Sequence, residues 1–214
     1  MRNLYSSNIC ILLMSCSNYY KSEVAVDEYH KAKFDSFLTQ FAQFDGKQLD
    51  ESFFRVRENF PAEIGHPDID KYYFSFLLPY DDECNCVTKE LYYCPCYKIE
   101  KNNYYLVSMD VCCDVTKTAG YPYDENTLVT YDKNGKMIDF AMVGIGSDLE
   151  SCKIEPSSKE NEIVYTQYYF KHIESAYDGD CDISVYKVTV DDNGKIDKRL
   201  LREEKSVKVA SLDI

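Results

Sequence analysis

The sequence predicts a mainly β fold, in which one N-terminal amphipathic helix precedes an antiparallel β-meander that is sandwich-like or partial-propeller-like. Short segments rich in β-branched and aromatic residues recur after Gly46, separated by Pro residues and Asn-Gly pairs. The chain of 214 residues has 20 Tyr and 11 Phe but no Trp, and Tyr suits half-buried sheet faces. No helical segment separates these strand-like segments, so consecutive strands are expected to pair antiparallel.

One segment has a helical period, with apolar residues at i, i+3, i+4, i+7 and i+10. Asp27 is expected as its N-cap and Gly46 as its stop. An aromatic stripe of this kind is expected to pack on a sheet as part of the core. The stripe consists of Phe34, Phe37, Leu38, Phe41 and Phe44.

The strand predictions rest on alternating apolar residues bounded by turn-forming residues. The segments expected as strands are 52–57, 71–78, 91–99, 104–113, 127–131, 136–143, 163–170, 183–190 and 195–201.

An eight-residue pattern occurs twice, as VTYDKNGK at 129–136 and as VTVDDNGK at 188–195, which is 59 residues later. Each copy opens a tight turn with Asp and places Gly where a positive φ is needed. We interpret the pattern as one favoured hairpin turn used twice. Two blades of a propeller-like fold are the alternative.

The net charge is −13, with 37 acidic and 24 basic residues. A phosphate backbone would be repelled, so the sequence argues against nucleic acid as a partner. The same charge disfavours adsorption to an anionic membrane by electrostatics alone. Beyond the N-terminus, no apolar stretch approaches the ~20 residues that span a bilayer, so any membrane attachment is expected to be an anchor.

The N-terminus has the order of a signal peptide: Arg2, then an apolar run at 9–14, then the small residue Ser15 before Cys16. Leu13-Met14-Ser15-Cys16 resembles the lipobox of bacterial lipoproteins. The resemblance implies that Cys16 is diacylated and becomes the new N-terminus, and that the protein is anchored to the outer membrane, at the cell surface or in the periplasm. The alternative is that residues 8–16 form a buried strand of a cytosolic protein.

This interpretation divides the chain into a signal peptide at 1–15, a polar tether at 16–26 and a single mainly β domain at 27–214. With its Phe-rich helix, Tyr-rich strands and Asp-x-Asn-Gly hairpins, the chain resembles small lipoproteins of unknown function that are common in gut anaerobes. The resemblance implies no active site. The expected function is a non-enzymatic binding module for a protein or a glycan, because exposed Tyr supplies contact area at low entropic cost.

Four cysteines are symmetric about Glu90, so that a hairpin centred there would place them on one face of a sheet. Pro95 lies between two of them and predicts an edge strand. In an oxidising compartment the four would form cross-strand disulfides. The alternatives are unpaired buried thiols and a metal-binding domain in which the four hold zinc. The four are Cys84, Cys86, Cys94 and Cys96, whereas Cys112 and Cys113 are expected to pair with Cys152 or Cys181.

Asp178, Asp180 and Asp182 have the spacing of the first half of a calcium loop. The rest of such a loop is missing, so an acidic surface turn is the preferred interpretation. For catalysis, the histidines occur singly and no nucleophile, metal-protease or phosphate-binding motif is present. The catalytic residues therefore stay unknown, no cofactor is expected, and a carboxylate-dependent hydrolase is the third hypothesis for the function.

The lipobox-like segment makes the first testable prediction. We expect Cys16→Ala to abolish metabolic labelling with fatty acid and to release the protein from the membrane fraction. Wild-type protein that carries no fatty acid and retains Met1 would contradict the anchor.

Overall fold

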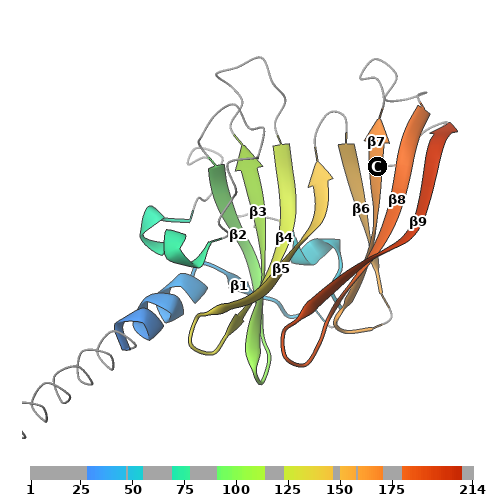
Figure 1. Cartoon of the computed structure of the whole chain (residues 1–214). Helices are drawn as coiled ribbons and strands as arrows, with labels where there is room; N and C mark the ends of the chain where they lie inside the picture. Colours follow the sequence, from blue (N-terminus) through green and yellow to red (C-terminus); the bar gives the residue numbers. More distant parts are fainter. Residues whose placement is uncertain are drawn as a thin grey trace, which may run out of the picture.

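The computed structural model describes residues 28–46, 48–54, 69–77, 91–113, 123–146, 150–157, 159–170 and 180–208 (Figure 1). Residues 28–38 are helical. Strands and 3-10 helices follow in the order β1 (Ala42–Gln43), η1 (Glu51–Phe53), η2 (Lys71–Phe76), β2 (Leu91–Glu100), β3 (Tyr104–Cys113), β4 (Tyr123–Asp132), β5 (Met137–Gly146), β6 (Glu150–Pro156), β7 (Glu162–Phe170), β8 (Asp180–Val190) and β9 (Ile196–Lys208).

The strands form two sheets. Sheet A has the order β1-β2-β3-β4-β5 and sheet B the order β6-β7-β8-β9. All neighbours pair antiparallel except the short β1, which pairs parallel with β2 through Ala42–Tyr97 and Gln43–Lys98. Strands β2–β5 therefore form one four-stranded meander, and strands β6–β9 form another. The predicted mainly β, sandwich-like fold with an N-terminal helix is confirmed.

One face of sheet A is covered by the N-terminal helix and η2. Their apolar side chains pack with those that β3 and β4 direct to this face, among them Val107, Met109 and Val129. The Tyr131 hydroxyl donates a hydrogen bond to the carbonyl of Phe76, which ties η2 to the sheet. The aromatic stripe is core as predicted for Phe34, Phe37, Leu38 and Phe41, all of which are buried here.

The other face of sheet A packs against sheet B. Leu106 and Leu128 of sheet A contact a cluster that includes Ile163 and Val188 of sheet B. The segment around η1 supplies further members of this cluster, Leu49, Phe53 and Phe54. The middle parts of strands β3 and β4 are thus buried on both faces, which agrees with the consecutive apolar pairs Leu106–Val107 and Leu128–Val129.

Side chains of sheet B cover the backbone of β5, the outer strand of sheet A. The amide of Gln167 accepts a hydrogen bond from Ile145 N at 3.0 Å and donates one to Ile145 O at 2.9 Å. Lys195 and Lys198 donate to the carbonyls of Ile138 and Met142. Because the edge is satisfied in this way, it offers little template for pairing with another chain.

The repeated turns occupy corresponding places in the two sheets. Asp132 in the β4–β5 turn and Asp191 in the β8–β9 turn each accept two backbone hydrogen bonds through Oδ1. Gly135 and Gly194 have φ of 91° and 80°, as the turn prediction requires. Strands β2 and β6 begin 59 residues apart, as do β5 and β9. The two copies of the turn pattern are therefore separated by the same number of residues as corresponding strands of the two meanders.

The helix ends earlier than the sequence predicts. Its regular part stops at residue 38, and Lys98 Nζ donates to the carbonyl of Leu38 at 2.6 Å. The chain then joins sheet A as β1, and Phe44 N donates to Lys98 O at 2.9 Å. Phe44 consequently packs with the second cluster and not with the rest of its stripe.

Two predicted strands are wrong in their described parts. The segments expected at 52–57 and 71–78 begin instead as the 3-10 helices η1 and η2. In each, an Asp precedes the helix and accepts a hydrogen bond from the backbone N–H two residues on, Asp50 from Ser52 and Asp70 from Tyr72. Such a cap competes with strand pairing. Strands β1 and β6 were not predicted at all.

The buried stripe makes a prediction about stability. Phe37 has no solvent exposure, so we expect Phe37→Ala to lower the free energy of unfolding by about 3–5 kcal/mol. Phe140, which is 53% exposed, is the control, and its Ala variant should stay within about 1 kcal/mol of wild type. Equal denaturation midpoints for the two variants would show that the stripe is not core.

Candidate functional site

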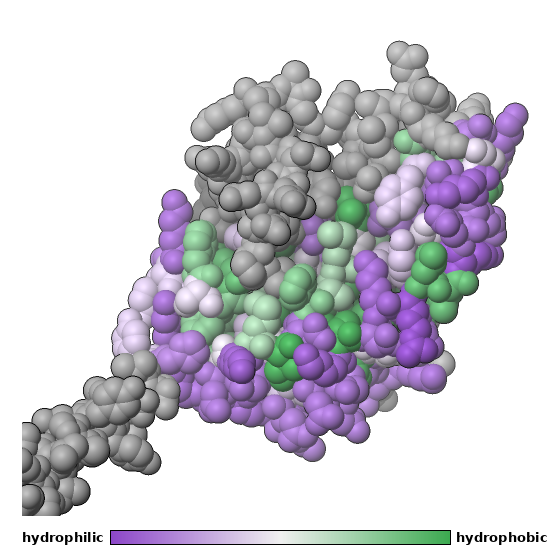
Figure 2. Space-filling model, viewed as in Figure 1, coloured by the Kyte–Doolittle hydropathy of each residue, from purple (hydrophilic) through white to green (hydrophobic). Residues whose placement is uncertain are grey.

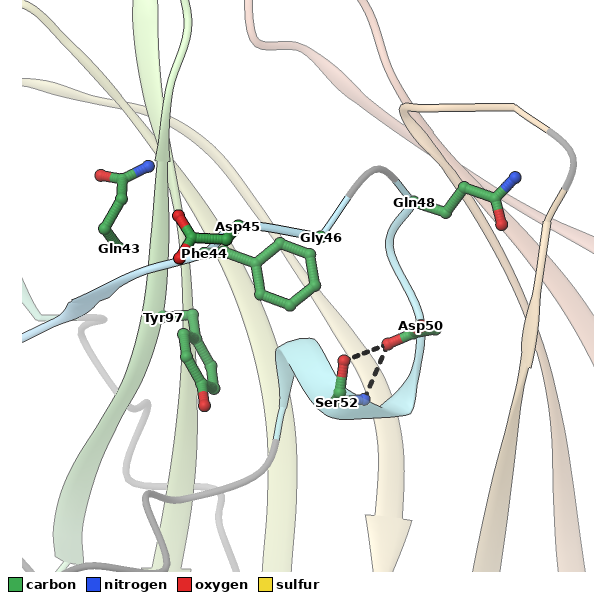
Figure 3. Close-up of a pocket in the computed structure, with 8 residues that line it drawn as sticks. All are labelled: Gln43, Phe44, Asp45, Gly46, Gln48, Asp50, Ser52 and Tyr97. Atoms are coloured by element: carbon green, nitrogen blue, oxygen red, sulfur yellow. Dashed lines mark hydrogen bonds between the residues drawn. The ribbon is translucent and has the colours of Figure 1, made fainter.

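A cavity lined by described residues lies beside the segment that runs from β1 to η1. It has a volume of about 430 Å³, within the range of roughly 300–1,000 Å³ that is usual for small-ligand sites. The residues that line it are Gln43, Phe44, Asp45, Gly46, Gln48, Asp50, Ser52 and Tyr97 (Figure 3). A smaller cavity of about 260 Å³ lies at the β8–β9 turn.

Aromatic rings form the apolar part of the pocket. Phe44 and Tyr97 meet edge to face with their centroids 5.5 Å apart, and Phe44 makes a similar contact at 4.9 Å with the buried Phe53. Phe53 in turn packs between the two sheets. The pocket therefore rests on the core, which holds its aromatic wall in place.

A bulge in β2 positions Tyr97. Pro95 pairs with Met109 and Lys98 with Val107, so Cys96 and Tyr97 together stand opposite the single residue Ser108. The Ser108 hydroxyl accepts a hydrogen bond from Tyr97 N at 3.2 Å and donates one to the carbonyl of Phe53. One buried hydroxyl thus links the strand that carries Tyr97 to the helix that closes the pocket.

The polar part of the pocket consists of carboxylates, amides and a hydroxyl. Asp50 Oδ1 accepts hydrogen bonds from the N–H and the hydroxyl of Ser52, which fixes that carboxylate at the pocket wall. The side chains of Asp45 and Asp50 both line the cavity, and no Lys, Arg or His does so among the described residues. In a chain with a net charge of −13, this composition disfavours an anionic ligand.

Of the predicted cysteine cluster, Cys94 and Cys96 are described, and Cys84 and Cys86 lie outside the described residues. Cys94 and Cys96 are fully buried in β2, which pairs with β3. Cys96 Sγ donates to the carbonyl of Phe54 at 3.2 Å. Burial raises the pKa of the Cys96 thiol, so the neutral thiol is its favoured form in this structure.

The four described cysteine side chains, those of Cys94, Cys96, Cys152 and Cys181, are thiols and not disulfide-bonded. The predicted bridges from Cys152 and Cys181 are therefore not formed in this structure. Cys152 faces β5, where its Sγ donates to the carbonyl of Val143 at 3.5 Å, and burial raises the pKa of Cys152 to about 12. Cys181 lies within sheet B, opposite Phe170 and Val207.

The calcium candidate is described at two of its three residues. Asp180 is exposed at the start of β8, and Asp182 accepts a hydrogen bond from Ser206 N at 2.8 Å and lies 3.5 Å from Lys205 Nζ. Asp178 lies outside the described residues. Within the part of the chain that is described, no three His, Cys, Asp or Glu side chains gather as metal ligands.

Of the histidines, only His30 is described. Its ring packs on Phe76 at a centroid distance of 5.2 Å, so it lies on the helix side of sheet A. His66 and His172 lie outside the described residues. No predicted site residue lines the pocket.

The pocket was missed because its residues carry no motif. Phe44 was assigned to the helical stripe, Gly46 to the helix stop and Ser52 to a strand. The available signal was the polar run 45–52 between two Phe residues, together with Asp50 two residues before Ser52, which is the spacing of a side-chain-capped turn.

The chain matches no protein-family model, no curated protein and no solved structure. The pocket is consequently defined by its own geometry. Its aromatic wall and its carboxylate, amide and hydroxyl groups can hold a small polar ligand.

The packing around the pocket also explains why residue 46 is a glycine. A Cβ atom on Gly46 would lie 2.4 Å from the ring of Phe44, so we expect Gly46→Ala to push this ring away from Phe53 and Tyr97. The cost should be about 1–3 kcal/mol of unfolding free energy. In a Phe44→Leu background the same substitution should cost less, because the opposing ring is gone. Equal costs in the two backgrounds would show that the glycine and the ring do not interact.

Proposed function

We propose that the chain is an exported, lipid-anchored bacterial protein whose domain binds a neutral glycan without chemically converting it. The observation that carries the proposal is the pocket, in which the Phe44–Tyr97 wall meets carboxylate, amide and hydroxyl groups. A sugar has a C–H face that packs on an aromatic ring and hydroxyls that both donate and accept hydrogen bonds. Asp, Gln and Ser side chains provide partners for these hydroxyls.

The charge of the pocket narrows the ligand class. Asp45 and Asp50 line the cavity, and the exposed Glu51 follows directly in sequence. Phosphorylated, sulfated or uronic-acid sugars would meet repulsion here, whereas neutral or amino sugars would not.

The lipid anchor rests on the resemblance of residues 13–16 to a lipobox. The described residues contain no helix with the length and apolar character of a membrane span. In this proposal Cys16 carries the anchor, and the segment 16–26 links it to the domain. Binding a glycan near a bilayer suits a protein that captures ligands at a cell envelope.

The two other hypotheses have less support. A zinc site would need Cys96 as a thiolate, but Cys96 is buried and donates to a backbone carbonyl. A carboxylate hydrolase would use Asp45 and Asp50, but Asp50 Oδ1 already caps η1 through Ser52. This bond favours a structural role for Asp50 over proton transfer.

A panel of neutral, amino and acidic oligosaccharides tests the ligand class, with binding to a retained sugar then measured by calorimetry. We expect neutral or amino sugars to bind and acidic sugars to fail. Asp45→Asn should weaken binding about tenfold or more, because a hydrogen bond to a charged group contributes about 1.5–3 kcal/mol.

Asp192→Asn, at an exposed position in the β8–β9 turn, is the matched control and should bind like wild type. No sugar bound at millimolar concentration, or equal losses in the two variants, would disprove the site. Cleaved sugar detected by mass spectrometry would show that the protein is a hydrolase and not a binding module. Binding of lysine-rich peptides with no binding of sugars would identify a protein as the ligand.

A further inference from the structure

Three of the four exposed Tyr and Phe side chains among the described residues lie on the helix and η2, the fourth being Phe140 of β5. Of the six large apolar side chains that are exposed, three lie on the helix and η2: Tyr29 at 62%, Tyr72 at 47% and Phe74 at 42%. Tyr29 and Tyr72 are joined by a hydrogen bond of 2.9 Å between their hydroxyls. We call these three residues the aromatic surface.

A lysine contacts the aromatic surface. Lys33 Nζ lies 4.5 Å from the centroid of the Tyr72 ring and donates to Ser75 Oγ at 3.2 Å. Lys31 and Lys71 lie on the same two helices. Among the described residues of the helix and η2 and the caps beside them, these three cations match Glu28, Asp35 and Asp70 in number, although the net charge of the chain is −13.

Sheet B has a different surface. Figure 2 shows hydrophilic residues along β9 and around the hairpin ends, with apolar residues interspersed. Arg199, Arg202 and Lys205 there form ion pairs with neighbouring acidic side chains of the same strand. The helix and η2 cover the face of sheet A opposite sheet B (Figure 1), so the two surfaces belong to opposite ends of the layered fold.

From these observations we propose that the aromatic surface rests on the phospholipid bilayer that carries the anchor. The inference depends on the lipid anchor of the proposed function. Twelve residues lead from Cys16 to Glu28, and they span at most about 40 Å when fully extended. The start of the helix is therefore held within this distance of the anchored residue, which lets the helix side reach the membrane.

The side-chain chemistry fits the interfacial zone of a bilayer. Tyr places its ring among the upper acyl carbons and its hydroxyl among the headgroups. Lysine extends its charged end toward phosphate while its methylene groups stay apolar. Zwitterionic lipid is the expected surface, because the net charge of the whole chain opposes an anionic one.

The absence of Trp from the chain allows a direct test, since a single introduced Trp reports only its own surroundings. Full-length lipidated Tyr72→Trp, verified by intact mass, is reconstituted at low density in phosphatidylcholine vesicles with and without bromine on the upper acyl carbons. We expect about twofold quenching by brominated lipid, because interfacial apolar side chains enter the bilayer by about 5–10 Å.

Leu200→Trp is the matched control, because Leu200 is 52% exposed on sheet B, and it should show no quenching. Phe74→Trp is a second reporter should Trp at position 72 disturb the Tyr29 contact. Lipidated protein that is quenched at neither reporter, or equally at Leu200→Trp, overturns the membrane contact and leaves the anchor standing. Protein without lipid at Cys16 overturns both the anchor and this inference. The proposed glycan pocket is then still tested by the sugar-binding experiment.

Discussion

The burial of sheet A on both faces is the constraint on which the rest of this structure depends. Strand β3 directs Val107 and Met109 toward the helix and Leu106 toward sheet B, and all three are fully buried. A sheet buried in this way needs two covering layers. The helix with η2 supplies one, and sheet B with η1 supplies the other. Neither layer has an equivalent partner elsewhere among the described residues, so loss of sheet A would expose both apolar clusters.

The sequence predicted what local patterns specify. The part of the stripe from Phe34 to Phe41 and the two Asp-x-Asn-Gly turns follow from short-range signals, and both appear in the fold as predicted. The end of the helix was mispredicted because a longer-range bond decides it, whereas the two 3-10 helices depend on local Asp caps and, for η2, on a longer-range bond as well. Lys98 caps the carbonyl of Leu38 from sixty residues away, and Tyr131 holds η2 through the carbonyl of Phe76. A pattern search along the chain does not detect such pairings.

The pocket illustrates the same limit. It requires a bulge in β2, a buried hydroxyl on β3 and a capped turn before η1, which are brought together only by tertiary packing. No one of these features is distinctive in sequence. The cysteine pattern, by contrast, is conspicuous in sequence, yet Cys94 and Cys96 are buried thiols that pack as small apolar side chains. Conspicuous residues thus serve the core here, and inconspicuous ones form the cavity.

The two turn glycines bear on the order in which the layers assemble. A Cβ on Gly135 would lie 2.5 Å from the Phe34 ring of the helix, and one on Gly194 would lie 3.1 Å from Tyr104 of sheet A. Each hairpin tip therefore fits against an aromatic ring of the layer that precedes it in the chain. A protein that is synthesised or exported with its N-terminus first presents each ring before the turn that covers it. The layers can then be added in succession, from helix to sheet A to sheet B, with no need to wait for a later segment.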